Sequence, residues 1–173
     1  MKSTLIIKRA EATDAQKVLE ITRKSFAVYR DSIPADVSLA ALIETVGDVE
    51  KDISENYVYV AETSKKTEGS IRFTLLTPDI AYIYRFGVNP ASNNTGIGSG
   101  LLARAIEEIA TLGAKIVALH TNSKYYKLAR YYYGRGFYVH STDTSKGYIR
   151  AFFVKELTDN GIEGLDLTLA YNR

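Results

Sequence analysis

The sequence of 173 residues contains no cysteine, no tryptophan, one methionine and two histidines. Without cysteine the chain can form no disulfide, no thiolate nucleophile and no cysteine-bound metal site, and it suits a reducing compartment. The two histidines, His120 and His140, stand twenty positions apart, a spacing that matches no common pair of metal ligands. We therefore expect no metal in this protein.

Long apolar runs and blocks of like charge are missing as well. Near the N-terminus only Leu5, Ile6 and Ile7 form an apolar run, well short of the roughly 7–15 residues of a secretory signal. No run approaches the roughly 20 residues that span a bilayer. The net charge is +2 and the basic residues are dispersed, so there is no nucleic-acid footprint. The expectation is a soluble, cytoplasmic protein with no membrane or nucleic-acid partner.

The composition that remains is that of an ordinary globular protein, with 46% apolar and 24% charged residues. At this length we expect one domain that buries roughly two-thirds of the surface of its unfolded chain. Apolar periodicity predicts the order β-α-α-β-β-β-α-β-α-β-β, which is a mixed α/β sheet. Strands are expected at residues 5–8, 57–61, 70–76, 81–88, 115–120, 137–141 and 148–156, and helices at 13–26, 38–53, 101–112 and 123–133.

Local signals mark several ends of these elements. Thr13-x-x-Gln16 has the form of a capping box that opens the first helix. Residues 29–34 are expected to form a loop, because Pro34 disfavours helix at the residue before it. Gly47 indicates a kink within the second helix, and Gly113 indicates the end of the third.

The last sixteen residues, 158–173, follow the expected domain of residues 1–157 as a C-terminal extension. Within it Leu165, Leu167, Leu169 and Tyr171 recur at every second position, the pattern of a strand. Such a strand would pair either with the edge of this sheet or with that of a second subunit, giving a homodimer. The alternative is a frayed chain end.

A glycine-rich loop connects the strand at 81–88 to the helix that follows. Residues 88–102 read VNPASNNTGIGSGLL, with Gly96, Gly98 and Gly100 in five positions. Such loops let backbone N–H groups reach an anion at a helix N-terminus. The spacing is neither that of a dinucleotide fold nor that of a P-loop. The loop alone therefore indicates either a phosphate site or a tight turn that needs small residues.

A second segment, residues 119–137, reads LHTNSKYYKLARYYYGRGF. Together the two segments resemble the GNAT family of acetyl-CoA-dependent N-acetyltransferases. The first follows that family's V-x-P-x-x-(R/Q)-x-x-G-x-G/A loop, with Val88, Pro90, Gly96 and Gly98 in register. The second follows its Y-x-x-x-G-F helix end, here Tyr132, Gly136 and Phe137. The resemblance implies a central mixed sheet of about seven strands flanked by about four helices.

The resemblance also implies a role for particular residues. Backbone amides of residues 94–99 would cradle the pyrophosphate of coenzyme A, and the Val88 N–H would polarise the thioester carbonyl. Tyr132 would protonate the departing thiolate, a suitable task for a phenol; the alternative is that Tyr132 is a core aromatic. The implied cofactor-binding residues are Phe86, Gly87, Val88, Asn93, Asn94, Thr95, Gly96, Ile97, Gly98, Ser99 and Tyr125.

The base that takes the proton from the attacking amine is harder to assign. Many family members carry a glutamate on the strand at 81–88, where this chain has Tyr82, Tyr84 and Arg85. Relatives that acetylate protein N-termini carry a glutamate twelve residues before the tyrosine, and that position is His120. An imidazole suits general-base work near neutral pH. The alternatives are a chain of water molecules as base, and a histidine that only packs or forms hydrogen bonds.

Two positions depart from the family pattern. Asn93 stands where the family has arginine or glutamine, so the loop has no charge unless Lys124, Lys127 or Arg130 contributes one. Tyr125 replaces an asparagine that contacts the pantetheine arm. Despite these departures, the resemblance implies direct acetyl transfer from acetyl-CoA, in a ternary complex, to a small-molecule amine or a peptide N-terminus. Its rivals are a non-catalytic acyl-CoA-binding or regulatory module and a structural domain that binds no nucleotide.

Overall fold

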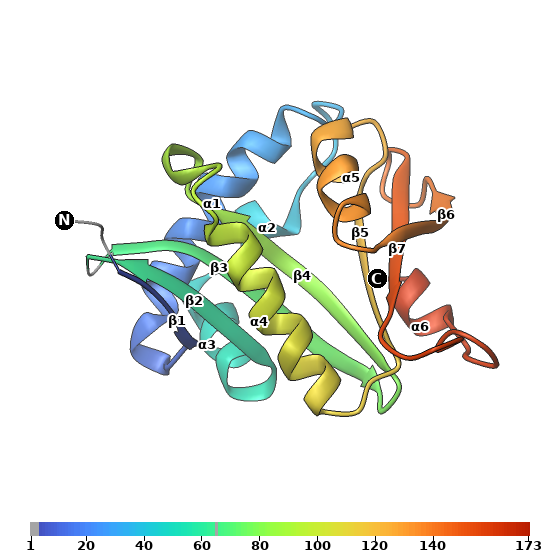
Figure 1. The fold of residues 1–173 in the computed structure, drawn as a ribbon. Coiled ribbons are helices and arrows are strands. Elements are labelled where there is room, and N and C mark those ends of the chain that lie inside the picture. Colours follow the sequence, from blue (N-terminus) through green and yellow to red (C-terminus); the bar gives the residue numbers. More distant parts are fainter. Residues whose placement is uncertain (1–3, 65) are drawn as a thin grey trace.

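A seven-stranded sheet organises the protein in the computed structural model, which describes residues 4–64 and 66–173 (Figure 1). The strands lie in the order β1-β2-β3-β4-β5-β7-β6, and every neighbouring pair is antiparallel except β4 and β5. The predicted mixed α/β sheet is thereby confirmed. The strands are β1 Leu5–Arg9, β2 Tyr57–Thr63, β3 Lys66–Thr77, β4 Ile80–Val88, β5 Ile116–Asn122, β6 Tyr138–Asp143 and β7 Arg150–Glu156.

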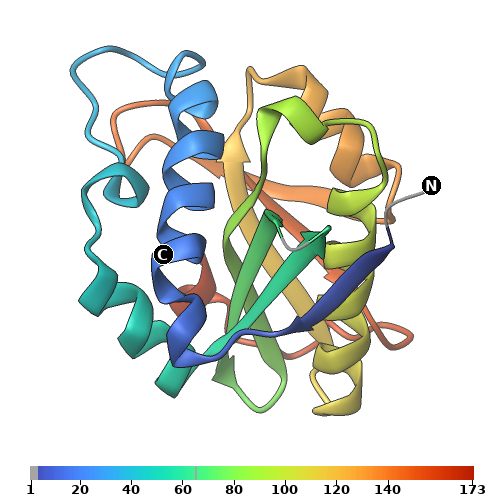
Figure 2. The same cartoon turned by 90° about the vertical axis from the view of Figure 1, so that its left-hand side faces the viewer.

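Helices cover both faces of the sheet, as Figure 2 shows with α1 and α4 on opposite sides. Side chains alternate along each strand. On β2, Tyr59 and Ala61 pack with α4, whereas Val58 and Val60 pack with α1 and α3. The helices are α1 Ala15–Arg30, α2 Ala40–Ile43, α3 Val46–Glu55, α4 Ile97–Thr111, α5 Tyr126–Tyr133 and α6 Thr168–Tyr171, with short 3-10 turns at Ala12–Asp14 and Pro90–Ser92.

The first helix differs from the prediction at both ends. Its capping box is formed by Glu11 and Asp14 around the preceding 3-10 turn, and Thr13 and Gln16 do not form one. The helix continues through Tyr29 to Arg30, where a loop was expected. The Arg30 side chain explains the extension, since its Nη1 donates to the Pro34 carbonyl at 2.7 Å and so stabilises the turn that follows.

The predicted helix at 38–53 is two helices, α2 and α3, separated by extended backbone at Glu44 and Thr45. Thr45 and Asp48 form a reciprocal capping box that starts α3. Gly47 therefore lies in the first turn of α3 and marks no kink. This division, together with α6, accounts for six helices where about four were expected.

The predicted edge strand in the C-terminal extension is wrong. Asp166 accepts hydrogen bonds from the backbone and hydroxyl of Thr168, which starts the short helix α6. Ala170 is fully buried in an apolar cluster with Ile80 and Phe152, on the sheet face opposite α4. Leu165 and Leu167 pack against this cluster from an irregular segment. The alternation at period two thus arises from packing without a strand.

The middle of the sheet opens where β4 and β5 part. They pair only between Ile80–Tyr82 and Ile116–Ala118, and Figure 1 shows them diverging beyond this point. A bulge in β4 bends it, because Arg85 and Phe86 together lie opposite the single residue Ile71 of β3. Arg85 has a φ of 50°, an unusual backbone conformation for a side chain of its size.

Candidate active site

A cleft of about 1700 Å³ occupies the space where β4 and β5 separate. Its walls come from α1, β4, the glycine-rich loop, β5, α5 and the residues after α6. Most of the residues implied by the family resemblance line it. These are Phe86, Gly87, Val88, Asn93, Asn94, Gly96, Gly98, Ser99, His120, Tyr125 and Tyr132.

Two residues of that implied set turn away from the cleft. The hydroxyl of Thr95 donates to the Ser92 carbonyl at 2.6 Å. Ile97 is 5% exposed and packs in the core beneath α4. Only their backbone groups remain available to a ligand in the loop.

The glycine-rich loop presents the start of α4 to the cleft. Asn94 and Gly96 have left-handed backbone, with φ of 64° and 88°, and Gly96 is the N-cap of α4. The first intrahelical bond runs from Gly100 N to Gly96 O at 2.9 Å. The amides of the preceding residues in the turn therefore have no helical partner, and the positive end of the helix dipole adds to them. This is an anion-binding geometry.

The bulged end of β4 offers its backbone to the same cleft. Asn89 N donates to Glu68 O at 2.7 Å, so this pair is hydrogen-bonded in the antiparallel ladder with β3. The next pair, Gly69 with Val88, is then a non-hydrogen-bonded pair. Val88 accordingly directs its N–H and C=O away from β3, toward the side where β5 has departed.

Close packing of α1 fixes this strand end. A Cβ added at Gly87 would lie 2.0 Å from Oγ and 2.6 Å from Cβ of Ser25 on α1. Only glycine allows the helix to approach the strand so closely. The backbone of residues 86–88 is thus held in place from the face opposite α4.

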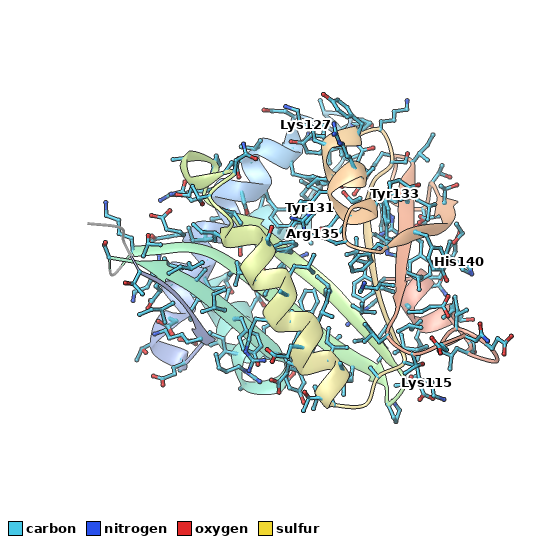
Figure 3. The ribbon with its side chains drawn as sticks, viewed as in Figure 1. Lys115, Lys127, Tyr131, Tyr133, Arg135 and His140 are labelled. Atoms are coloured by element: carbon cyan, nitrogen blue, oxygen red, sulfur yellow. The ribbon has the colours of Figure 1, made fainter. Side chains whose placement is uncertain are left out.

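The charge that the loop lacks comes from Arg135, which the sequence reasoning missed. Its Nη2 donates to Ser99 Oγ at 2.5 Å, and its Nη1 donates to the Tyr131 carbonyl at 2.9 Å. Figure 3 shows Arg135 and Tyr131 on the side of α5 that faces the start of α4. Of the three expected basic residues only Lys127 lines the cleft. The available signal was a basic residue inside the Y-x-x-x-G-F motif, directly before Gly136.

Tyr132 is both a core residue and a cleft residue. It is 6% exposed, and its ring packs against those of Phe137 and Phe153 at centroid distances of 5.5 and 5.6 Å. Burial raises the pKa of its phenol well above the usual value, and the nearby hydroxyls of Tyr131 and Tyr82 raise it further. The group therefore holds its proton at neutral pH, as a proton donor must.

His120 approaches the cleft from the opposite face of the sheet. Its ring packs against Phe152 in the cluster that includes α6, whereas Tyr132 belongs to the cluster under α4. Its Nδ1 lies 2.8 Å from the hydroxyl of Tyr82. Burial lowers the pKa of His120 to about 4, and the positive charge of Arg150 contributes in the same direction. The imidazole is neutral at pH 7.

Tyr125, the N-cap of α5, takes the place of the family's asparagine. Its ring lies 6.2 Å from that of Tyr29 on α1, and both line the cleft. The Tyr29 hydroxyl in turn accepts a hydrogen bond from Asn122 N at 2.8 Å. An aromatic pair therefore spans the gap between α1 and the end of β5.

A buried ionic cluster forms the wall of the cleft beside α2 and α3. Arg72 is fully buried and binds Glu44 at 2.7 Å and Asp52 at 2.9 Å. Arg85 Nε lies 3.2 Å from Glu44, and the Tyr84 hydroxyl donates to Asp52 at 3.0 Å. Two of the three strand residues that stand where the family has its glutamate, Tyr84 and Arg85, therefore contact carboxylates from α3 and from the segment before it.

Across residues 4–64 and 66–173 no group of three or more histidine, aspartate or glutamate side chains could hold a metal ion. His140 is exposed at the edge of the molecule (Figure 3); it is not part of the cleft wall, and its ring packs edge-on against Phe152. In the same part of the chain no helix has the length and apolar character needed to cross a membrane.

Comparison with known families identifies this arrangement. The model of the acetyltransferase (GNAT) family matches residues 15–137, which include β4, the glycine-rich loop, α4, β5 and α5. This chain belongs to the GNAT family. It is therefore an acetyltransferase domain, and the fold implied by the family resemblance is confirmed. No curated protein matches the chain by sequence.

Solved GNAT structures share the fold at low sequence identity. The PaiA N-acetyltransferase of Thermoplasma acidophilum, in complex with coenzyme A, has a TM-score of 0.76 and 19% identity, over 88% of this chain and 99% of that one. The ribosomal-protein-S18-alanine N-acetyltransferase of Escherichia coli has a TM-score of 0.72 and 15% identity, over 94% and 99%. The YncA protein of Salmonella typhimurium, with acetyl-CoA, has a TM-score of 0.72 and 17% identity, over 90% and 95%.

Proposed function

We propose that this GNAT protein transfers the acetyl group of acetyl-CoA directly to an amine, with both substrates bound at once. One observation carries the proposal: a single cleft receives the anion-binding loop and Tyr132 from one face of the sheet and His120 from the other. Two substrates could therefore enter from opposite sides and meet where β4 and β5 part.

The residues present fit coenzyme A. The free amides at the start of α4 and the guanidinium of Arg135 would hold the pyrophosphate, and charge-assisted contacts of this kind are the stronger ones. The Val88 N–H, which has no partner on β3, would donate to the thioester carbonyl. Bound acetyl-CoA supplies the activated acyl group. The chain's own part is to orient that group, exclude water and move protons.

The proton donor would be Tyr132, whose buried phenol stays protonated until a thiolate departs beside it. The amine must lose a proton, and we assign that proton to His120 or to water that His120 orients. Neighbours in the fold are named for N-acetyltransfer, in one case to the alanine of a ribosomal protein. A small-molecule amine and a peptide N-terminus are the acceptor classes we propose.

Two measurements separate this proposal from a non-catalytic acyl-CoA-binding module. Acetyl-CoA at 100 times its dissociation constant should raise the free energy of unfolding by about 2.7 kcal/mol and so raise the melting temperature. Release of free thiol on a panel of amines and peptides should follow. If millimolar acetyl-CoA leaves the melting temperature unchanged, both the N-acetyltransferase and the binding module are contradicted. If acetyl-CoA stabilises the protein but no acceptor leads to release of thiol, the binding module is supported.

Tyr132→Phe tests the assignment of the acid. We expect this change to slow turnover by roughly 100-fold, the scale of general acid catalysis, and to leave the affinity for acetyl-CoA unchanged. Tyr133→Phe is the matched control, because Tyr133 is the next residue of α5 but is 55% exposed and is absent from the cleft wall. Equal rates for the two variants would remove Tyr132 from the mechanism.

A further inference from the structure

Three side chains lead from the cleft into the protein on the sheet face opposite α4. Tyr82 on β4 lines the cleft, and its hydroxyl lies 2.8 Å from Nδ1 of His120 on β5. Nε2 of His120 lies 3.6 Å from Oδ2 of Asp143 at the end of β6. Asp143 is not part of the cleft wall, and its side chain is 7% exposed. The imidazole therefore stands between the phenol and a buried carboxylate.

The two ends of the imidazole face chemically different partners. Nε2 of His120 and Oδ2 of Asp143 are both buried without a hydrogen-bond partner and lie 3.6 Å apart, while Nη2 of Arg150 lies 3.1 Å from the same Oδ2. A carboxylate only accepts hydrogen bonds, whereas a phenol can donate one. A neutral ring with its proton on Nε2 satisfies both neighbours, since Nδ1 then accepts from Tyr82. The surroundings thus select one tautomer.

Charged and titratable groups from every neighbouring element act on this chain of residues. Arg150 on β7 donates to Asp143 Oδ1 at 3.1 Å, and Arg173 lies 5.8 Å from the centre of the Tyr82 ring. Lys146 disfavours protonation of His120, and the Tyr171 ring lies 6.3 Å from its ring. Tyr148 adds to the rise in the pKa of Tyr82, which burial brings to about 12. Burial, and then the cations Arg150 and Lys146, keep His120 neutral at rest, whereas Asp143 favours its protonated form.

We propose that Tyr82, His120 and Asp143 form a proton relay for the attacking amine, an inference that rests on the N-acetyltransferase function proposed above. As the amine nitrogen bonds to the acetyl carbon, its proton passes to the Tyr82 oxygen, and the Tyr82 proton passes to Nδ1 of His120. The C–S bond breaks and the thiolate takes the proton of Tyr132. The imidazolium is held by Asp143 through Nε2–H and returns its proton to water by the reverse path, and the Tyr132 phenolate takes a proton from water, so that both residues end as they began. Tyr82 is then the catalytic residue that meets the amine, and Asp143 is a positioning residue.

The tautomer can be measured without any substrate. Long-range proton–nitrogen NMR correlations of the imidazole should show His120 of the wild-type protein neutral at pH 7 with its proton on Nε2. Asp143→Asn should shift the ring toward the Nδ1–H form, whereas His140→Gln should leave the His120 signals unchanged. A wild-type ring that carries its proton on Nδ1 overturns the relay, even if the protein proves to be an active N-acetyltransferase.

The kinetic test uses Tyr82→Phe, which keeps the ring but removes the hydroxyl. We expect kcat to fall by about 100-fold at pH 7, as for loss of a general base, with KM for acetyl-CoA unchanged. Without the relay, kcat should rise about tenfold per pH unit as hydroxide takes the proton. A Tyr82→Phe rate equal to wild type from pH 6 to 9 overturns the relay. If acetyl-CoA does not stabilise the wild-type protein against heat, the N-acetyltransferase function itself is contradicted.

Discussion

The guanidinium carbon of Arg135 lies 3.5 Å from the centre of the Tyr131 ring. This stacking holds the planar cation in one orientation while its Nη2 reaches Ser99 at the start of α4. The cofactor loop has no charge of its own, since residues 93–95 are Asn-Asn-Thr. We therefore propose that this cation, held by an aromatic ring of α5, supplies the charge that Asn93 does not, at a loop position where the family pattern has arginine or glutamine.

Removing this cation should weaken binding of acetyl-CoA. A hydrogen bond to a charged group contributes about 1.5–3 kcal/mol, so Arg135→Ala should raise the dissociation constant roughly 10- to 100-fold. Isothermal titration calorimetry at low salt measures this dissociation constant. Arg130→Ala, one helical turn earlier on the exposed face of α5, is the matched control. An unchanged dissociation constant for Arg135→Ala would show that the loop amides suffice.

Local patterns made the fold predictable, together with most of the residues that line the cleft beside the glycine-rich loop. Most strands contain an apolar or alternating stretch, and the loop and the Y-x-x-x-G-F helix end are contiguous segments with fixed spacing. Both kinds of signal can be read from neighbours in the chain. The seven strands and their mixed arrangement followed from them.

Contacts between distant residues were not predictable in this way. Arg135 meets Ser99 across 36 positions, and Tyr82 meets His120 across 38. Whether such a pair meets depends on how far β4 and β5 diverge and where α5 starts, which no local pattern encodes. The error at α6 has a related cause, because Leu165 and Leu167 pack against the cluster that includes Phe152, and the short turn at Asp166 was not recognised as a helix start.

Gly87→Ala should destabilise the protein and disturb the cofactor site. The added Cβ would meet Ser25 at 2.0 Å, so α1 or the bulged strand must move. Overpacking of this kind costs typically about 1–3 kcal/mol, which urea unfolding would detect. Because the same movement shifts the Val88 amide, the affinity for acetyl-CoA should fall as well.

Two further variants test that explanation. Ser25→Gly removes both atoms that the new Cβ would meet, so the double variant should lose less stability than the two single changes together. Gly47→Ala is the contrasting variant, because a Cβ added at Gly47 in α3 would have Thr45 Oγ1 as its nearest neighbour, at an ordinary 3.7 Å. It should stabilise the protein by up to about 1 kcal/mol. If the stability losses of Gly87→Ala and Ser25→Gly add fully in their double variant, the steric explanation is ruled out.

The buried ionic cluster beside α2 and α3, in which Arg72 binds Glu44 and Asp52, should be essential to stability. Glu44→Ala leaves Arg72, which is fully buried, without its bidentate partner. Breaking a buried pair in this way costs roughly 3–5 kcal/mol. Glu55→Ala on α3 is the control, because Glu55 forms only an exposed ion pair with Lys51 at 4.0 Å, and such a pair contributes about 0–1 kcal/mol. Chemical denaturation that gives the same loss for both would contradict the assigned role of Glu44.

His120 should make the free energy of unfolding depend on pH. Its pKa is about 4 in the folded protein and 6.5 in the unfolded chain, chiefly because burial disfavours the charged ring. Between these values the unfolded chain binds a proton that the native protein does not, so stability is complete above pH 6.5. It then falls as the pH drops toward 4, by at most about 1.4 kcal/mol per pH unit.

Urea unfolding at several pH values between 4 and 7 measures this slope, and His120→Gln should reduce it. His140→Gln should leave it unchanged, because His140 is exposed. Asp143 acts in a separate range: burial would raise its pKa, but hydrogen bonds from Ser145 and Arg150 hold that pKa below its usual value. Its contribution is therefore lost only below about pH 4. An identical slope in His120→Gln and wild type would mean that the ring titrates normally in the folded protein, and would contradict the lowered pKa assigned to His120.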